Sequence, residues 1–285
     1  MSKKNNLILL MISFFVFLIQ IQSVSALPYT VKFYNPSTTP SIQSNAVSEI
    51  RNKNNFGPAG IVRDISFNVD YVSGITGETL AGADIFVTVF SVQSLRNYVV
   101  THVEAEKLKN FVMQGGSLIV TSDFGTVPRS AANVIGDHFG NVTIDSHRQN
   151  EPSITNITNR NIAPEITNGP FGNVNDTLTW GSDKAMGVYS EGDSTILDSR
   201  GIVSVINPTP TSGSVVFFSD TDFFHSYGGD WKSLRLNIFS YSAHSSFINN
   251  PSNQMSPIPE PATMALFGLG LLGLAGIGRR KTKNI

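Results

Sequence analysis

Three short, largely apolar runs constrain the fold of this 285-residue chain more than any other feature of its sequence. Residues 84–90 read DIFVTVF, residues 117–121 read SLIVT and residues 214–218 read SVVFF. Such runs are typical of strands that are buried on both faces of a parallel sheet, where every side chain contacts a covering helix. We therefore expect a mostly parallel sheet enclosed between two layers of helices.

Helical patterns alternate with these runs. Thr101 and Glu104 have capping-box spacing, and the apolar stripe behind them ends at Gly115 and Gly116, which predicts a helix with both ends marked. Other segments are helical in spacing (residues 42–50, 130–139 and 231–242) or extended (residues 31–34, 61–69 and 141–144). Alternating strands and helices predict an α/β domain with a flavodoxin-like, doubly wound, mostly parallel sheet.

The N-terminus has the three parts of a secretory signal. Lys3 and Lys4 precede an uncharged run of thirteen residues, 7–19, and Val24 and Ala26 supply small residues at the −3 and −1 positions. Because this run is too short to span a bilayer, we expect a signal peptide at residues 1–26. Signal peptidase would then cleave between Ala26 and Leu27.

A second uncharged run, residues 262–278, precedes a basic end that contains four Lys and Arg residues. As a helix, its seventeen residues would extend for about 25 Å, which is enough to cross a bacterial inner membrane. The basic end favours a cytoplasmic location for the residues that follow the run. We expect a transmembrane helix at residues 262–278, preceded by a polar linker at residues 246–258.

Pro259, Glu260 and Pro261, the Gly- and Leu-rich run and the basic end together resemble the PEP-CTERM sorting signal, over residues 259–285. This tail is also catalogued as an ice-binding-protein C-terminal domain, but the chain has no regular Thr-x-Thr array that would suit ice. The resemblance implies cleavage by exosortase, a membrane transpeptidase. The protein would be anchored transiently in the inner membrane and then reach the cell surface, envelope or extracellular matrix.

Three segments of the body, residues 80–87, 108–120 and 213–224, are similar to the class I glutamine-amidotransferase-like superfamily, in its noncatalytic and ThuA-like branches. We assign this domain to residues 27–245, with residues 146–185, rich in Asn, Thr, Pro and Gly, as an insertion over the strand ends. In that superfamily the amidotransferase activity needs a cysteine. This chain contains none, so the resemblance does not carry that activity over.

Between the two end segments the chain has a net charge of about −6, from 14 Lys and Arg against 20 Asp and Glu. This balance argues against nucleic acid and other anionic polymers as partners. Since no disulfide can form, the stability of the body depends on a packed core, and a domain of this length can supply one.

The candidate site consists of polar residues at the expected carboxyl ends of strands, where open α/β sheets bind ligands. Asp123 follows one strand, Asp220 and Asp222 follow another, and His225 is close behind. Carboxylate oxygens suit calcium, and carboxylates beside a histidine suit acid–base chemistry. Asp220 and Asp222 are explained more simply as turn caps, so we assign no catalytic residue.

We expect a noncatalytic binding or structural module, with extracellular polysaccharide as its partner class and no required cofactor. Two alternatives stay open: an extracytoplasmic hydrolase or carbohydrate-active protein that uses the carboxylates, and a calcium-stabilised adhesive domain. The body has no G-x-S-x-G or H-E-x-x-H motif, and its histidines show no paired spacing. The sequence therefore favours binding over catalysis.

Overall fold

A computed structural model of the chain describes residues 26–34, 44–90, 99–123, 126–144, 154–157, 160, 163–174, 177–179, 189–190, 195–196, 203–207, 209–224 and 229–249. The expected signal peptide except for Ala26, the sorting motif and the expected transmembrane run lie outside these residues. Within the described part, no helix is both long enough and apolar enough to cross a membrane.

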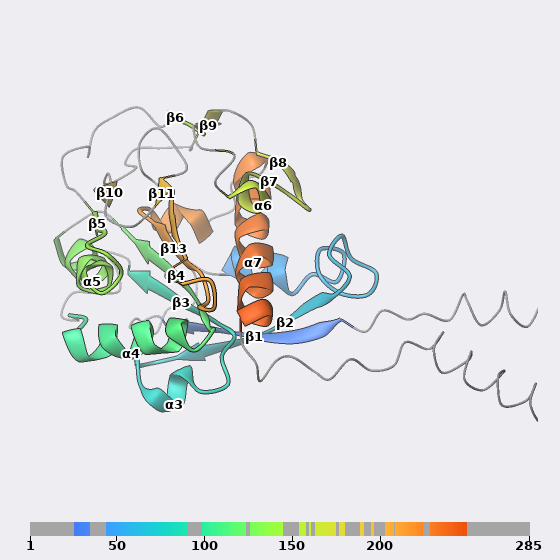
Figure 1. Ribbon diagram of the computed structural model, residues 1–285. Coiled ribbons are helices and arrows are strands. Elements are labelled where there is room, and N and C mark those ends of the chain that lie inside the picture. Colours follow the sequence, from blue (N-terminus) through green and yellow to red (C-terminus); the bar gives the residue numbers. More distant parts are fainter. Residues whose placement is uncertain are drawn as a thin grey trace, which may run out of the picture. The chain divides into compact units, whose positions relative to one another are not determined.

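A seven-stranded sheet forms the centre of the body, in the order β11-β12-β13-β4-β3-β1-β2 (Figure 1). Five neighbouring strands are parallel: β2 (Ile65–Val72), β1 (Leu27–Tyr34), β3 (Ile85–Phe90), β4 (Ser117–Ser122) and β13 (Val215–Phe218). At one edge, β12 (Val203–Ile206) and β11 (Thr195–Ile196) are antiparallel. The expected α/β class with a mostly parallel sheet is confirmed, and the expected buried runs form three adjacent central strands in which every residue is buried.

Helices cover both faces of the sheet. On one face, α2 (Ser44–Ile50) and α7 (Asp230–Asn249) pack into a core with the strands. On the other face, α3 (Gly77–Leu80), α4 (His102–Met113) and α5 (Thr126–Asp137) form a second core. This two-sided covering explains why the central strands have no polar face.

Helix α4 begins and ends where its sequence signals predict. Thr101 Oγ1 accepts a hydrogen bond from the Glu104 backbone N–H at 3.2 Å, and Glu104 Oε2 accepts one from the Thr101 N–H at 2.9 Å. After the helix, Gly115 has φ +100°, a conformation that favours glycine. Gly116 lies directly against the ring of Phe111, so a side chain at this position would clash.

Part of the expected insertion at residues 146–185 packs against a core helix. Helix α6 (Pro164–Thr167) and the hairpin of β7 (Asn168–Gly169) and β8 (Gly172–Asn173) pack beside α7 (Figure 1). The buried Asn237 side chain donates hydrogen bonds to the carbonyls of Ile166 and Gly172 and accepts one from the Phe171 N–H. A core helix therefore holds part of the insertion through backbone groups, which the sequence pattern cannot reveal.

Four further short strands complete the described structure: β5 (Thr143–Ile144) pairs with β10 (Tyr189–Ser190), and β6 (Ile154–Asn156) pairs with β9 (Thr177–Thr179). Two boundaries differ from expectation, because β1 already begins at Leu27 and β2 begins only at Ile65. Helix α7 continues to Asn249, four residues into the expected linker.

Candidate functional site

The structure sets two of the expected carboxylates at the carboxyl ends of neighbouring strands. Thr121 of β4 and Phe218 of β13 form the last pair of their register, and Asp123 and Asp220 follow this pair by two residues each, at the same end of the sheet. The Asp123 N–H also donates to the Phe90 carbonyl, at the end of β3, at 2.7 Å. The side chain of Asp222 and the whole of His225 lie outside the described residues, so the four-residue cluster stays a prediction.

The surroundings of Asp220 fit a turn cap at least as well as a ligand site. Asp220 is buried, and it directly precedes the 3₁₀ turn η2 (Thr221–Phe224), where an aspartate commonly caps the free N–H groups. Within the described structure, Ser219 Oγ and Thr88 Oγ1 are buried without a hydrogen-bond partner. Among the same residues, no group of three or more His, Asp or Glu side chains is placed to hold a metal ion.

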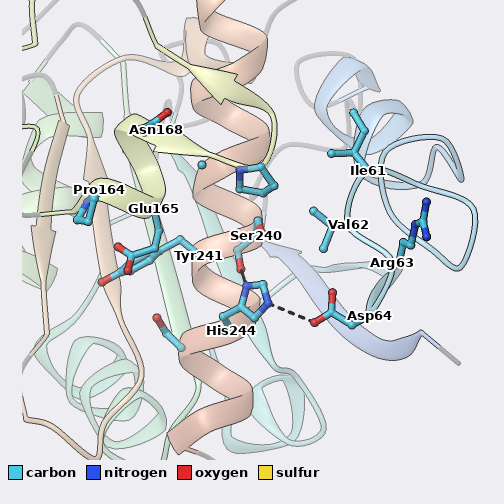
Figure 2. Close-up of a pocket in the computed structure, with 13 residues that line it drawn as sticks. Ile61, Val62, Arg63, Asp64, Pro164, Glu165, Asn168, Ser240, Tyr241 and His244 are labelled. Carbon is cyan, nitrogen blue, oxygen red and sulfur yellow. Dashed lines mark hydrogen bonds and ion pairs between the residues drawn. The ribbon is translucent and has the colours of Figure 1, made fainter. Parts of the chain in front are cut away.

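A groove of about 870 Å³ lies elsewhere on the body (Figure 2). Its walls come from three segments: residues 61–64 ahead of β2, residues 164–170 in and after α6, and residues 240–245 in the second half of α7. Sequence reasoning missed it, because these segments are at least 70 residues apart in the chain and meet only in the folded body.

His244 lies at the centre of the groove (Figure 2). Its Nδ1 is 2.9 Å from the Ser240 carbonyl, and its Nε2 is 3.4 Å from Asp64 Oδ2. A carbonyl can only accept, so Nδ1 carries a proton and donates it. Both side chains of the His244–Asp64 pair are largely exposed, so the pair adds little to stability and leaves polar atoms accessible to a ligand.

Tyr241 supplies the aromatic side chain of the groove, with Glu165 nearby (Figure 2). Its hydroxyl donates to Asn207 Oδ1 at 3.0 Å. Burial raises the pKa of Tyr241 above its ordinary value, and the negative charge of Glu165 adds to the rise. The phenol therefore stays neutral at ordinary pH and serves as a hydrogen-bonding group rather than a base.

The groove and the expected carboxylate site lie at opposite ends of the parallel strands. Asp64 precedes β2, and its carbonyl accepts from the Leu27 N–H at the start of β1. The Ser242 carbonyl, beside Tyr241, accepts from Ser117 Oγ at the start of β4. The groove thus lies at the amino ends of the strands. Asp123 and Asp220 lie at the carboxyl ends, where catalytic sites of such sheets are found.

A third feature was also missed from the sequence. His102 and His138 are 36 residues apart, yet His102 Nδ1 lies 3.3 Å from His138 Nε2. Metal-site motifs are recognised by short spacing within one element, and this pair comes from two helices. No local signal in the sequence could have revealed it.

Residues 257–281 match the family described as the PEP-CTERM protein-sorting motif. The match confirms the recognition of the tail that contains Pro259, Glu260 and Pro261. No curated protein matches the sequence.

Solved structures resemble the body in fold. The mmIFT52 N-terminal domain aligns with a TM-score of 0.51 and 16% identity, over 75% of this chain and 96% of that domain. A cytoplasmic protein of Salmonella typhimurium aligns with a TM-score of 0.45 and 11% identity, over 76% and 99%. A β-galactosidase from Bacillus circulans sp. alkalophilus aligns with a TM-score of 0.43 and 13% identity, over 79% of this chain and 32% of the enzyme. All three identities are below 25%, so these likenesses concern the fold alone.

Proposed function

Because the chain carries a PEP-CTERM sorting motif, we propose that it is an exported cell-envelope or extracellular-matrix protein whose body is a noncatalytic binding or structural module. The motif at residues 257–281 carries this proposal, since such a motif implies processing by exosortase and sorting to the cell surface. The absence of cysteine supports a noncatalytic body, because the amidotransferase nucleophile of similar folds has no counterpart here.

The maturation route has two cuts. Signal peptidase removes residues 1–26, and exosortase then cleaves near Pro259, Glu260 and Pro261 while the run at residues 262–278 holds the chain in the inner membrane. The first strand supports the position of the first cut. Strand β1 begins at Leu27 and lies between β2 and β3, so cleavage after Ala26 leaves the body intact from its first strand residue.

Mass spectrometry of the mature termini tests this route. In a host with exosortase, the mature protein should begin at Leu27 and lack residues 279–283. A variant with Ala in place of Pro259 and Pro261 and Gln in place of Glu260 should keep the basic end and stay in the membrane fraction. Recovery of the unaltered protein with its basic end intact from such a host would contradict the sorting proposal.

The binding surface of the module is the groove of Figure 2, and its ligand is a neutral extracellular polysaccharide. An aromatic ring, an amide and carboxylates are groups that bind sugar rings and hydroxyls, and Tyr241, Asn168 and Glu165 supply them here. Two carboxylate residues, Glu165 and Asp64, line the groove together with one arginine, Arg63, and this balance disfavours an anionic polymer.

Affinity electrophoresis in gels that contain neutral polysaccharide tests the groove. E165Q should weaken retention several-fold, because it replaces a strong acceptor of sugar hydroxyl hydrogen bonds. E78Q is the matched control, since Glu78 and Glu165 are both exposed and both lie in the first turn of a four-residue helix. Equal retention of E165Q and E78Q would contradict the proposal that the groove binds the polysaccharide.

One observation favours a second candidate, an extracytoplasmic hydrolase. Asp123 and Asp220 follow paired residues of β4 and β13, so two carboxylates lie at the end of the sheet where such folds carry out catalysis. If the protein turns over a polysaccharide, D123N/D220N should abolish the activity. Unchanged turnover in that variant would exclude Asp123 and Asp220 from the chemistry.

A further inference from the structure

A cluster of titratable side chains lies where α4 meets α5. His102 is the first residue of α4, and His138 directly follows α5. Their rings are 5.6 Å apart between centroids and tilted by 45°, with His102 Nδ1 3.3 Å from His138 Nε2. Two ring nitrogens from different helices therefore face each other at the surface.

Glu106 fixes the orientation of the His138 ring. Its Oε2 lies 2.9 Å from His138 Nδ1, and the His138 side chain is only 18% exposed. An ionised carboxylate can only accept, so Nδ1 carries the proton and the neutral ring keeps a lone pair on Nε2. That lone pair is directed toward His102. A carboxylate behind the distal nitrogen is the arrangement that commonly orients a metal-binding histidine.

The separation of the two nitrogens fits two arrangements. At 3.3 Å, one ring can donate an N–H hydrogen bond directly to the other. Zinc–imidazole bonds are about 2.0–2.1 Å, and two nitrogens on one tetrahedral ion therefore lie about 3.3–3.4 Å apart. The observed distance fits a shared ion.

We propose that His102 Nδ1 and His138 Nε2 bind one divalent transition-metal ion of the imidazole-preferring class, such as Zn²⁺ or Cu²⁺. Glu106 orients the His138 ligand, and water completes the coordination. With two protein ligands rather than the four of structural zinc sites, the ion is exchangeable. The chain has no cysteine to compete for it.

Two helix ends and two carboxylates contribute to the charge around the pair. The N-terminus of α4 opposes positive charge at His102, whereas the C-terminus of α5 favours it at His138. Glu104 and Glu106 place two carboxylates within the first turns of α4. These carboxylates offset the unfavourable end of the α4 dipole.

Calorimetric titration of the full-length chain with Zn²⁺, and then with Cu²⁺, tests the site. The unaltered protein should bind one ion with both His ligands visible as nitrogen couplings in the Cu²⁺ resonance spectrum. H102Q and H138Q should each weaken binding at least tenfold, and E106Q should weaken it by roughly tenfold while both nitrogen couplings remain. Because His102 is exposed, H102Q keeps the test valid even if H138Q unfolds.

H244Q is the matched control, since His244 is also a solvent-accessible helical histidine with a carboxylate neighbour. It should bind metal as the unaltered protein does. The proposal would be overturned by wild-type affinity in H102Q/H138Q, by equal losses in H244Q and H102Q, or by no binding of Zn²⁺ and Cu²⁺ to the unaltered protein.

Discussion

Arg235 of α7 is completely buried, and its guanidinium meets the carboxylate of Glu49 on α2. Nε lies 2.8 Å from one carboxylate oxygen, and a terminal nitrogen lies 2.9 Å from the other. This two-pronged geometry is the strong form of an arginine–carboxylate pair. It joins the first and last helices of one sheet face, across 186 residues of sequence.

Replacing one partner of this pair should lower the free energy of unfolding more than replacing both partners. E49A leaves the buried guanidinium without its carboxylate, which should lower the free energy of unfolding by about 3–5 kcal/mol. E49A/R235M should recover much of that loss, because Met fills similar space without a charge. Urea unfolding of the three proteins measures both effects, and a double variant no more stable than E49A would contradict this account.

Only some of the side chains that lie near one another could be predicted from the sequence. Asp123 and Asp220 could be placed at one edge, because strands recognised from their apolar runs end just before them. His102 and His138 could not be paired, because their contact depends on how α4 meets α5. The same holds for Asp64 and His244, which lie in segments that meet only in the folded chain.

At the level of helices and strands, the elements that are buried on both faces were the easiest to predict from the sequence. Strands β3, β4 and β13 have no polar face, so they appear as continuous apolar runs. The end of helix α7 was predicted wrongly, because its second half is rich in serine. Ser242 and Ser246 are nevertheless buried. A polar composition predicted a linker from residue 246, whereas packing against the core keeps the chain helical to Asn249.

The close approach of β4 and β13 at their amino ends depends on a missing side chain. A Cβ at Gly213 would clash with the backbone carbonyl of Gly116, which cannot move away as a side chain could. G213A should therefore lower stability by about 1–3 kcal/mol. G77A is the control, because a Cβ there meets nothing within 4 Å. Thermal unfolding with equal losses in both variants would refute the clash.

At the scale of the whole molecule, the body forms a compact unit at residues 25–254, separate from the two end segments. Stability should then depend on where the chain is cut at its N-terminus. A fragment of residues 27–254 should unfold cooperatively at the same Tm as the full chain, since it keeps every described strand and helix.

A fragment that begins at Val31 should fail to fold. It loses half of β1, and with it the pairing of Leu27, Pro28, Tyr29 and Thr30 with β2. Because β1 lies between β2 and β3, the loss exposes an interior strand position rather than an edge. Circular dichroism of the two fragments decides the matter. A cooperative transition at unchanged Tm in the shorter fragment would mean that the body begins after Leu27, and signal cleavage could then occur several residues downstream of Ala26 without harm to the fold.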